Sequence, residues 1–183
     1  MKEFLFVTSN DKKLKAFQAL FTSLGIKISK LQQDHPEDIE SASTPIENAI
    51  KKAQYYVYFH ELPVLTHDGG IKIDGALYAE FKRNYEEILR VTKRGSKLEW
   101  IDAFAISSKN GALCAFQVPI ISGRFLPPKE YAQGNSSFLG EDIFYIPLFK
   151  KVYGQLTENE KEKIEEIRLS RILPKLKQII TNL

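Results

Sequence analysis

The opening of the chain constrains the fold most, because an apolar run there is followed almost at once by an amphipathic helical pattern. The run from Glu3 to Val7 (EFLFV) is typical of a buried strand. After a short turn, Asp11 is the predicted N-cap of a helix that Gly25 ends. The apolar face of this helix holds Leu14, Phe17, Phe21 and Leu24. A strand that leads directly into a helix favours an α/β fold.

Three lysines crowd the first turn of this predicted helix, at Lys12, Lys13 and Lys15. The N-terminal end of a helix dipole favours negative charge, so acidic residues would stabilise the helix better there. The lysines fit a bound anion instead, because the free backbone N–H groups of a helix N-terminus attract phosphate. This segment alone is explained equally well by a basic helix face in contact with solvent.

Further along, the pattern alternates between strands and helices until a hairpin enters. Residues 44–47 (TPIE) form a capping box with proline at the first helical position, and Asn110-Gly111 is a strong hairpin signal. Residues 67–70 (HDGG) are expected to break a strand, and residues 124–137 to form a loop. The predicted strands are 26–31, 63–66, 71–74, 100–107, 112–121 and 143–148; the predicted helices are 44–59, 80–93 and the last ~25 residues, with a kink or new start at Pro174. We therefore predict one α/β domain over residues 1–183, built on a mixed sheet.

Composition limits the functional classes. The 183 residues carry 26 basic and 23 acidic side chains, interspersed along the chain, for a net charge of +3. This balance permits polyanion binding without indicating it. Cys114 is the only cysteine, which excludes an intrachain disulfide and a cysteine metal cluster. No signal peptide opens the sequence and no apolar run approaches the ~18 residues that span a bilayer, so we expect a cytoplasmic protein without a membrane partner.

Polar clusters lie where strands are predicted to end or helices to begin. They occupy residues 8–15, 37–40, 67–68 and 141–142. In an open α/β sheet, ligands bind beyond the strand ends, so these clusters are candidates for the functional site. Two carboxylates from separate loops with lysines nearby suit a Mg²⁺–phosphate site, because Mg²⁺ takes one or two protein carboxylates together with phosphate oxygens and waters.

Four blocks of sequence resemble the signatures of the inosine-triphosphate pyrophosphatase family, in the family's order and across almost the whole chain. Residues 6–13 (FVTSNDKK) resemble its T-x-N-x-x-K signature, and residues 44–53 (TPIENAIKKA) its second-helix signature. Residues 63–71 (PVLTHDGGI) resemble P-V-L-x-[DE]-D-[ST]-G-L, and residues 139–147 (LGEDIFYIP) resemble F-G-Y-D-P-I-F-x-P. The resemblance implies a long mixed, twisted sheet with helices on both faces and two lobes around a central cleft.

The resemblance also implies an activity and the residues that perform it. The family hydrolyses nucleoside triphosphates to monophosphate and pyrophosphate, with a preference for deaminated purines such as inosine and xanthosine, and its members are commonly homodimers. Carried onto matching positions, it implies Glu40 and Asp68 as Mg²⁺ ligands, and Asp68 and Lys13 as catalytic residues. The implied substrate-binding residues are Thr8, Asn10, Lys13, Lys52, Asp142 and Lys163. Magnesium and lysines would stabilise charge on the leaving pyrophosphate while a carboxylate orients the attacking water.

Several positions depart from the family pattern. His67 and Gly69 replace the first acid and the hydroxyl residue of the third block, and Glu141 stands where the family has an aromatic residue that can stack on the base. The family's S-H-R triplet has no clean match. Alignment on Lys163 places residues 167–169 (IRL) there, whereas a shifted register places Ser170 and Arg171 there, and neither register restores the histidine. A pocket that hydrogen-bonds a polar base edge discriminates strongly, and loss of those partners removes the discrimination. We therefore expect an altered base preference.

Two hypotheses of different class remain open. The first is a Mg²⁺-dependent nucleoside-triphosphate pyrophosphatase with a changed base preference. The second is a catalytically weakened or inactive homologue that binds a nucleotide or a protein partner on the same scaffold, which His67 and Gly69 favour. His67 itself is either a base or substitute metal ligand, or a residue that is simply hydrogen-bonded. A nucleic-acid partner is not expected, because the chain has no recognition-helix motif and no aromatic and basic RNA-binding signature.

Overall fold

The structure is a computed structural model that describes residues 2–8, 11–31, 36–79, 84–128, 140 and 142–181. Its elements in chain order are β1 (Lys2–Val7), α1 (Asp11–Ser23), β2 (Ile26–Leu31), the short 3₁₀ helix η1 (Glu37–Glu40), α2 (Pro45–Val57), β3 (Val64–Ile73), β4 (Ala76–Tyr78), α3 (Tyr85–Val91), β5 (Lys97–Ser107), β6 (Leu113–Phe125), β7 (Phe144–Ile146), β8 (Lys151–Val152), the 3₁₀ helix η3 (Tyr153–Gln155) and α4 (Glu158–Thr181).

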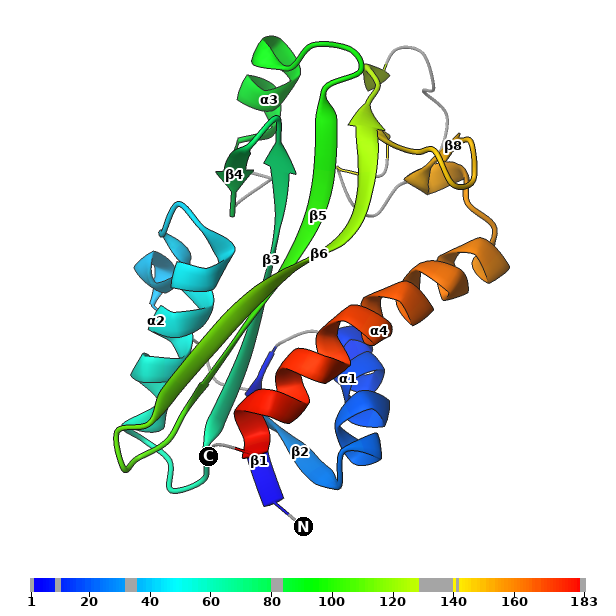
Figure 1. The fold of residues 1–183 in the computed structure, drawn as a ribbon. Helices are drawn as coiled ribbons and strands as arrows, with labels where there is room; N and C mark the ends of the chain where they lie inside the picture. The colour runs from blue at the N-terminus through cyan, green and yellow to red at the C-terminus, as the bar shows by residue number, and fades with distance from the viewer. Residues whose placement is uncertain are drawn as a thin grey trace.

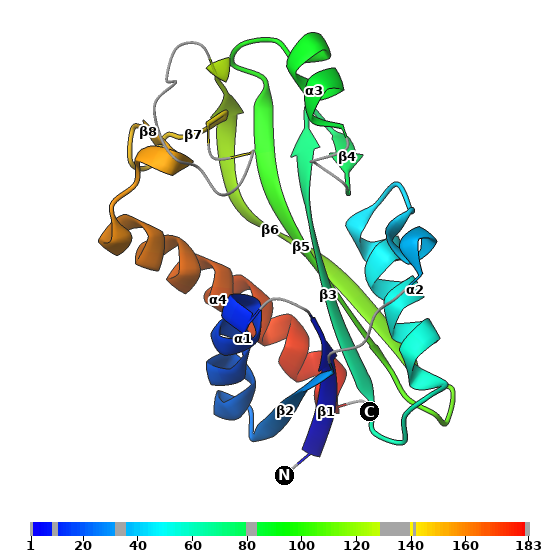
Figure 2. The ribbon, with the colours of Figure 1, turned by 180° about the vertical axis from the view of Figure 1, so that it is seen from behind.

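The strands form one mixed sheet in the order β2-β1-β3-β5-β6-β7-β8, and β4 pairs with β3 beside this path. β1 is parallel to β2 and β3, whereas the pairings from β3 through β5, β6 and β7 to β8 are antiparallel. Strands β3, β5 and β6 are long and twisted (Figure 1). Helices α1 and α4 lie on one side of the sheet and α2 lies on the other, as views from opposite sides show (Figures 1 and 2). The predicted fold class is confirmed.

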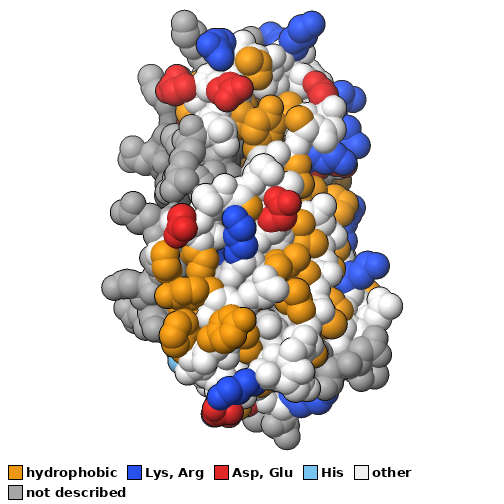
Figure 3. Space-filling model, turned by 90° about the vertical axis from the view of Figure 1, so that its left-hand side faces the viewer, with side chains coloured by type: hydrophobic (Ala, Val, Ile, Leu, Met, Phe, Trp, Pro, Cys, Tyr) orange, Lys and Arg blue, Asp and Glu red, His pale blue; other side chains and the backbone are white. Residues whose placement is uncertain are grey.

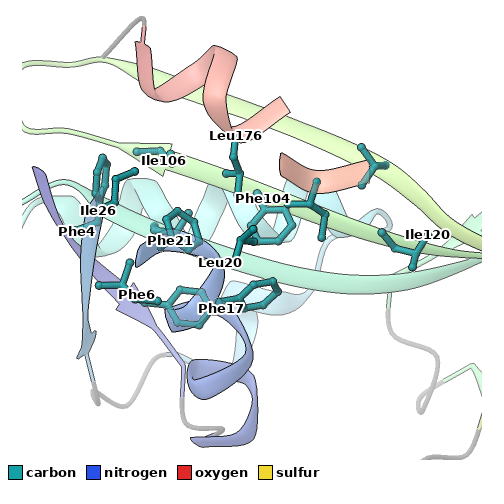
Figure 4. Close-up of a cluster of buried hydrophobic side chains, with 14 residues drawn as sticks. Phe4, Phe6, Phe17, Leu20, Phe21, Ile26, Phe104, Ile106, Ile120 and Leu176 are labelled. Carbon is teal, nitrogen blue, oxygen red and sulfur yellow. The ribbon is translucent and has the colours of Figure 1, made fainter. Parts of the chain in front are cut away.

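Two main hydrophobic clusters lie toward opposite ends of the long strands. In the first, which we call the lower core, the Phe17 ring of α1 lies edge-on to Phe6 of β1 and Phe104 of β5, with ring centroids 5.6 and 5.2 Å apart (Figure 4). The lower core consists of Phe4, Phe6, Phe17, Leu20, Phe21, Ile26, Ile28, Leu65, Phe104, Ile106, Val118, Ile120, Ile172 and Leu176. The upper core consists of Ile71, Ile73, Ile88, Leu98, Ile121, Phe125, Ile143, Phe144, Ile146, Leu156 and Ile164.

Residues 67–70 (HDGG) do not break a strand, so that prediction is wrong. β3 runs continuously from residue 64 to residue 73 and pairs with β5 along this whole length. Gly70 reflects close packing rather than a turn, because a Cβ there would lie 2.3 Å from Cγ of Pro45 and 2.7 Å from the carbonyl oxygen of Tyr78. The missing side chain thus lets the first turn of α2 and strand β4 approach the sheet closely.

The other predicted elements are present, with differences at their ends. Asp11 is the first residue of α1 rather than the cap before it. The predicted capping box is confirmed, since Oγ1 of Thr44 accepts a hydrogen bond from the backbone N–H of Glu47. β6 extends to Phe125, into residues predicted as loop, because it still pairs there with β7. Helix α4 continues through Pro174 without a new start.

Some predicted features fall partly outside the described residues. The helix predicted at 80–93 is present as α3 over 85–91, and residues 80–83 lie outside the described ranges. Glu141 also lies outside the described ranges, as do residues 129–137 of the loop predicted at 124–137. Within the described ranges, the helices are too short or too polar for any of them to cross a lipid bilayer.

Candidate active site

Between the two cores, three elements carry polar side chains at the same level of the molecule. On β3, residues 67–68 separate the part that joins the lower core from the part that joins the upper core. Asp102 likewise lies between the lower-core and upper-core residues of β5, and Arg168 lies between those of α4. Both are buried, as is Lys52 of the neighbouring helix α2. Because a buried charge costs free energy unless it is paired, this level of the fold is a candidate functional site.

On the α2 side of the sheet, Lys52 joins its helix to two acidic side chains. Lys52 is 5% exposed, and its Nζ donates to Oε1 of Glu40 at 2.7 Å and to the carbonyl oxygen of His67 at 3.2 Å. The same Nζ lies 3.7 Å from Oδ1 of Asp68. Lys52 is on the buried side of α2, whereas Glu40 ends the short helix η1 before it. One ammonium group therefore holds two carboxylates from separate elements close together.

Asp68 is an acid whose charge is disfavoured by its surroundings. Its side chain is 18% exposed, and burial raises the pKa of its carboxyl group; Lys52 opposes this effect and the Glu40 carboxylate adds to it. A further positive charge here would stabilise the ionised form of both acids. Two carboxylates fit Mg²⁺, which completes its shell with phosphate oxygens and waters. Within the described ranges, His, Cys, Asp and Glu do not gather in threes as a self-sufficient metal site.

Lys13, in the first turn of α1, shares this site. The pKa of its ammonium group is lowered, first by burial and then by the charge of Lys52, whereas Asp68 and Asp102 act in the opposite direction. Lys13 is thus close enough to respond to charges from α2, β3 and β5. Two lysines that repel each other in a partly buried place favour a bound anion, because a phosphate group would offset their repulsion.

The other face of the sheet carries a buried ion pair. Asp102 is fully buried, and its Oδ2 accepts a hydrogen bond from Nε of Arg168 at 2.6 Å. Nη1 of Arg168 lies 3.2 Å from Oε2 of Glu165, one turn earlier in α4. Burial alone would raise the pKa of Asp102, but the neighbouring His67 and Arg168 hold it well below its usual range. Asp102 is therefore a carboxylate at neutral pH.

His67 lies beside this pair, with its ring between Phe17 and Phe104 at centroid distances of 5.1 and 4.8 Å. Its Nε2 is 3.0 Å from Oδ1 of Asp102, and Nδ1 has no hydrogen-bond partner within the described part of the chain. Burial lowers the pKa of His67 to about 3, and the charge of Lys13 adds to this effect. A buried, neutral ring that faces away from Asp68 suits a packing role better than that of a base or a metal ligand.

Four predicted site residues therefore meet in the structure: Lys13, Glu40, Lys52 and Asp68. They come from α1, η1, α2 and β3, which are far apart along the chain. Their convergence at the level between the two cores gives a compact site with both cations and acids.

The Ham1 family model matches residues 4–169, which is most of the chain. The protein belongs to the Ham1 family. This match confirms the resemblance of the four sequence blocks. Among known relatives of this Ham1 protein, a dITP/XTP pyrophosphatase of Halalkalibacterium halodurans is 29% identical over 184 residues, which cover 90% of this chain and 92% of that protein. A dITP/XTP pyrophosphatase of Geobacillus kaustophilus is also 29% identical, with 90% and 88% covered.

Solved structures of Ham1 proteins share the fold. A HAM1 protein from Coxiella burnetii superimposes with a TM-score of 0.72 at 22% identity, and the match covers 100% of both chains. The Ham1 protein of Staphylococcus aureus gives a TM-score of 0.70 at 19% identity, with 99% of both chains covered. The mixed sheet with helices on both sides is thus the architecture of these Ham1 proteins.

Four further residues of this Ham1 protein are predicted to belong to the site: Thr8, Asn10, Asp142 and Lys163. Thr8 is partly buried just after β1, and Asn10 lies outside the described residues. Asp142 lies near Tyr85, whose phenol pKa is raised by burial and by this carboxylate. Lys163 is exposed on α4. For these four residues, as for Lys13 and Lys52, substrate binding stays a prediction.

Sequence reasoning missed Asp102 altogether and left Arg168 without a role in this Ham1 protein, although both had a signal. Asp102 interrupts an otherwise apolar strand, Trp100 to Ile106 (WIDAFAI), where a charge must be paired. Arg168 stands at four-residue spacing with buried apolar residues on the same helix face: Ile164, Ile172 and Leu176. A charged residue within such a stripe indicates a buried partner, here on β5.

Proposed function

We propose that this protein hydrolyses nucleoside triphosphates, deaminated purine nucleotides among them, to monophosphate and pyrophosphate, with Mg²⁺ as its cofactor. The observation that carries the proposal is the convergence of Lys13 and Lys52 with Glu40 and Asp68. The relatives described as dITP/XTP pyrophosphatases support the reaction and the substrate class.

These residue types suit the reaction. Formation of a monophosphate and pyrophosphate requires water to attack the α-phosphorus while the bond to the β-phosphate breaks. Lys13 and Lys52 would bind the triphosphate and offset the charge that develops on the departing pyrophosphate. Asp68, partly exposed and with its pKa raised by burial, would orient the water and accept its proton.

Glu40 and Asp68 would hold the Mg²⁺ ion. Bound there, the ion supplies positive charge that stabilises the phosphate oxygens. Without it, Lys52 is the cation between the two acids. We expect Lys52 to exchange Glu40 for a phosphate oxygen when substrate binds, because an ammonium group and a metal ion would then compete for the same carboxylate.

The base preference is proposed to differ from that of dITP/XTP pyrophosphatases. Position 168, within the segment that aligns with the base-contacting triplet, is an arginine that Asp102 holds. The third block has Gly69 in place of a hydroxyl residue, and no atom lies closer than 4.0 Å to where its Cβ would be. Both changes alter the hydrogen-bonding groups near the site, which are the groups that discriminate between bases.

We also propose a homodimer in the cytoplasm. Large hydrophobic side chains are exposed where α2 ends and β6 begins, namely Tyr58 (80%), Phe59 (58%), Leu62 (37%) and Leu113 (39%). An ion pair between Glu61 and Lys109 joins these two segments at the surface. Hydrophobic side chains also gather on the α2 side of the molecule (Figure 3). Exposed apolar patches of this kind mark protein–protein contacts, so sedimentation should give twice the mass of one chain.

The decisive experiment measures pyrophosphate and monophosphate from dITP, XTP, ITP and the common triphosphates, each with and without Mg²⁺. We expect both products together, in a Mg²⁺-dependent manner, from at least one deaminated nucleotide.

The second candidate function is that of a nucleotide-binding homologue without turnover. It is favoured by His67, whose ring replaces an acid and is buried and neutral. It predicts that nucleotides raise the melting temperature while no product forms.

A further inference from the structure

We propose that Asp102 is a positioning residue that acts through Arg168: its buried carboxylate fixes the guanidinium group near Lys13, where Arg168 contacts the bound nucleotide. This inference rests on the proposed function and adds a residue to the site. Oδ2 of Asp102 accepts from Nε of Arg168 at 2.6 Å, which is a short, charge-assisted hydrogen bond between two buried groups.

The guanidinium group is held on more than one side. Its Cζ lies 5.0 Å from the ring centroid of Phe17 and 5.6 Å from that of Trp100, within the range of cation–π attraction. Glu165 contacts Nη1 from the solvent side, and its own side chain is 42% exposed. A planar group bonded at Nε and packed against two rings keeps a fixed orientation, which is what recognition of a bound nucleotide requires.

Arg168 belongs to the same electrostatic site as the phosphate-binding lysines. Its charge acts on Lys13 as a repulsion, whereas Asp102 attracts the same ammonium group. Without Asp102, Arg168 and Lys13 would repel each other across a buried space, and the guanidinium group would lose its Nε partner. Asp102 therefore both orients Arg168 and permits the two cations to lie near one site.

This role of Asp102 can be tested by moving its carboxylate to position 67 on the neighbouring strand. The family pattern carries an acid there, whereas this chain has His67, whose Nε2 lies 3.0 Å from Oδ1 of Asp102. Residues 67 and 102 lie on the same face of neighbouring strands, so a carboxylate at either position could face Arg168. Two carboxylates at once would repel each other in a buried place.

The test compares kcat/KM for XTP, or for the best substrate of the panel, per folded molecule in wild type, Asp102→Asn, Arg168→Met and the double variant. We expect Asp102→Asn to lower kcat/KM by about tenfold or more, because a misplaced positioning group can cost ~100-fold. In the Arg168→Met background the same substitution should change kcat/KM less than about twofold, since Asp102 acts through Arg168. If Arg168→Met does not fold because Asp102 is left unpaired, the double variant, which removes both charges, is compared directly with Asp102→Asn. We expect these two proteins to have the same kcat/KM.

Three further variants separate positioning from mere stabilisation. His67→Glu combined with Asp102→Asn should recover part of the lost kcat/KM, whereas His67→Glu alone should lower it. Glu165→Gln is the matched control, since it removes the other carboxylate on Arg168 from a solvent-exposed place, where ion pairs contribute little. The NMR signal of the Arg168 Nε–H should be protected from exchange in wild type and in Glu165→Gln, and lost in Asp102→Asn.

Three results would overturn the inference while the proposed function stands. The first is that wild type hydrolyses substrate and folded Asp102→Asn has the same kcat/KM. The second is that Asp102→Asn lowers kcat/KM by the same factor in the wild-type and Arg168→Met backgrounds. The third is that the Arg168 Nε–H signal of wild type is not protected from exchange. A wild-type protein that neither hydrolyses nor binds any triphosphate would instead overturn the proposed function, and the inference with it.

Discussion

His67 and Asp68 are consecutive in the chain but face opposite sides of β3. Asp68 lies near Lys52 of α2, whereas the His67 ring packs on Phe17 of α1. Because strand residues alternate between faces, a pair of neighbouring acids in the family pattern would serve two different environments. The replacement of the first by histidine therefore leaves the face with Asp68, Lys52 and Glu40 intact, and changes only the face that holds Asp102.

Asp68→Asn tests the acid on the substrate side. We expect kcat to fall by at least ~100-fold, because the water loses its orienting base and the cation loses a ligand. The melting temperature without metal should stay equal or rise, since burial already disfavours the charged carboxylate. Product formation and thermal unfolding measured on the same preparation check both parts. Undiminished turnover would exclude the role of Asp68.

Lys52→Met tests the cation that joins two acids. The buried ammonium group makes a 2.7 Å hydrogen bond to Glu40, so its loss should lower the free energy of unfolding by about 1.5–3 kcal/mol. The KM for triphosphate should rise by about tenfold or more, because a phosphate contact is lost. Lys51→Met is the control, since Lys51 is the preceding residue of α2 and is exposed. Equal effects of the two substitutions on KM would contradict the assignment of Lys52.

Gly70→Ala tests the close packing that places α2 on the sheet. The added Cβ would meet Pro45 Cγ at 2.3 Å and the carbonyl oxygen of Tyr78 at 2.7 Å, so we expect a loss of about 1–3 kcal/mol of unfolding free energy. Gly69→Ala is the matched control, because its Cβ would meet nothing closer than 4.0 Å. Chemical denaturation of both variants checks this difference. A Gly70→Ala protein as stable as the control would show that β3 and α2 are less closely packed.

The buried His67 predicts a pH dependence of stability. Its pKa is about 3 in the folded protein against 6.5 for the unfolded chain, so between these values the unfolded state binds a proton that the folded state does not. Stability from this residue is therefore complete above pH 6.5 and falls as the pH drops toward 3, by up to ~1.4 kcal/mol per pH unit. The raised pKa of Asp68 contributes with the opposite sign.

The comparison of wild type with His67→Phe isolates this contribution, because the other titrating groups are common to both proteins. Denaturation between pH 7 and pH 5 should give a shallower decline for the variant, whose ring keeps the packing between Phe17 and Phe104. Parallel declines would mean that His67 is protonated in the folded state or reaches solvent.

Patterns local in sequence predicted most of the elements, because helix caps, hairpin turns and apolar periodicity act over a few residues. The capping box at Thr44 and the Asn110-Gly111 hairpin are examples. The exception at residues 67–70 has a long-range cause. Two glycines in succession are typical of a break, yet here β5 pairs along the whole strand and Pro45 occupies the space over Gly70.

The candidate site also contains some residues that local sequence predicts and others that only the fold explains. Lys13, Lys52 and Asp68 could be predicted because they fall in recognisable blocks of sequence, and Glu40 because it lies four residues before the second block. The pair of Asp102 and Arg168 could not, since a buried charge is understood only through a partner that is 66 residues away. An acid within an apolar strand and a base within an apolar helix stripe each predict a partner, but only the fold shows that they are partners of each other.

The most direct test of the account measures pyrophosphate and monophosphate released from dITP and XTP by wild type and by Lys52→Met, with Mg²⁺ and with chelator. We predict that wild type forms the two products in equal amounts only with Mg²⁺, and that Lys52→Met needs about tenfold more substrate for the same rate. Release of inorganic phosphate in place of pyrophosphate, or no product from a folded wild-type protein, would contradict it.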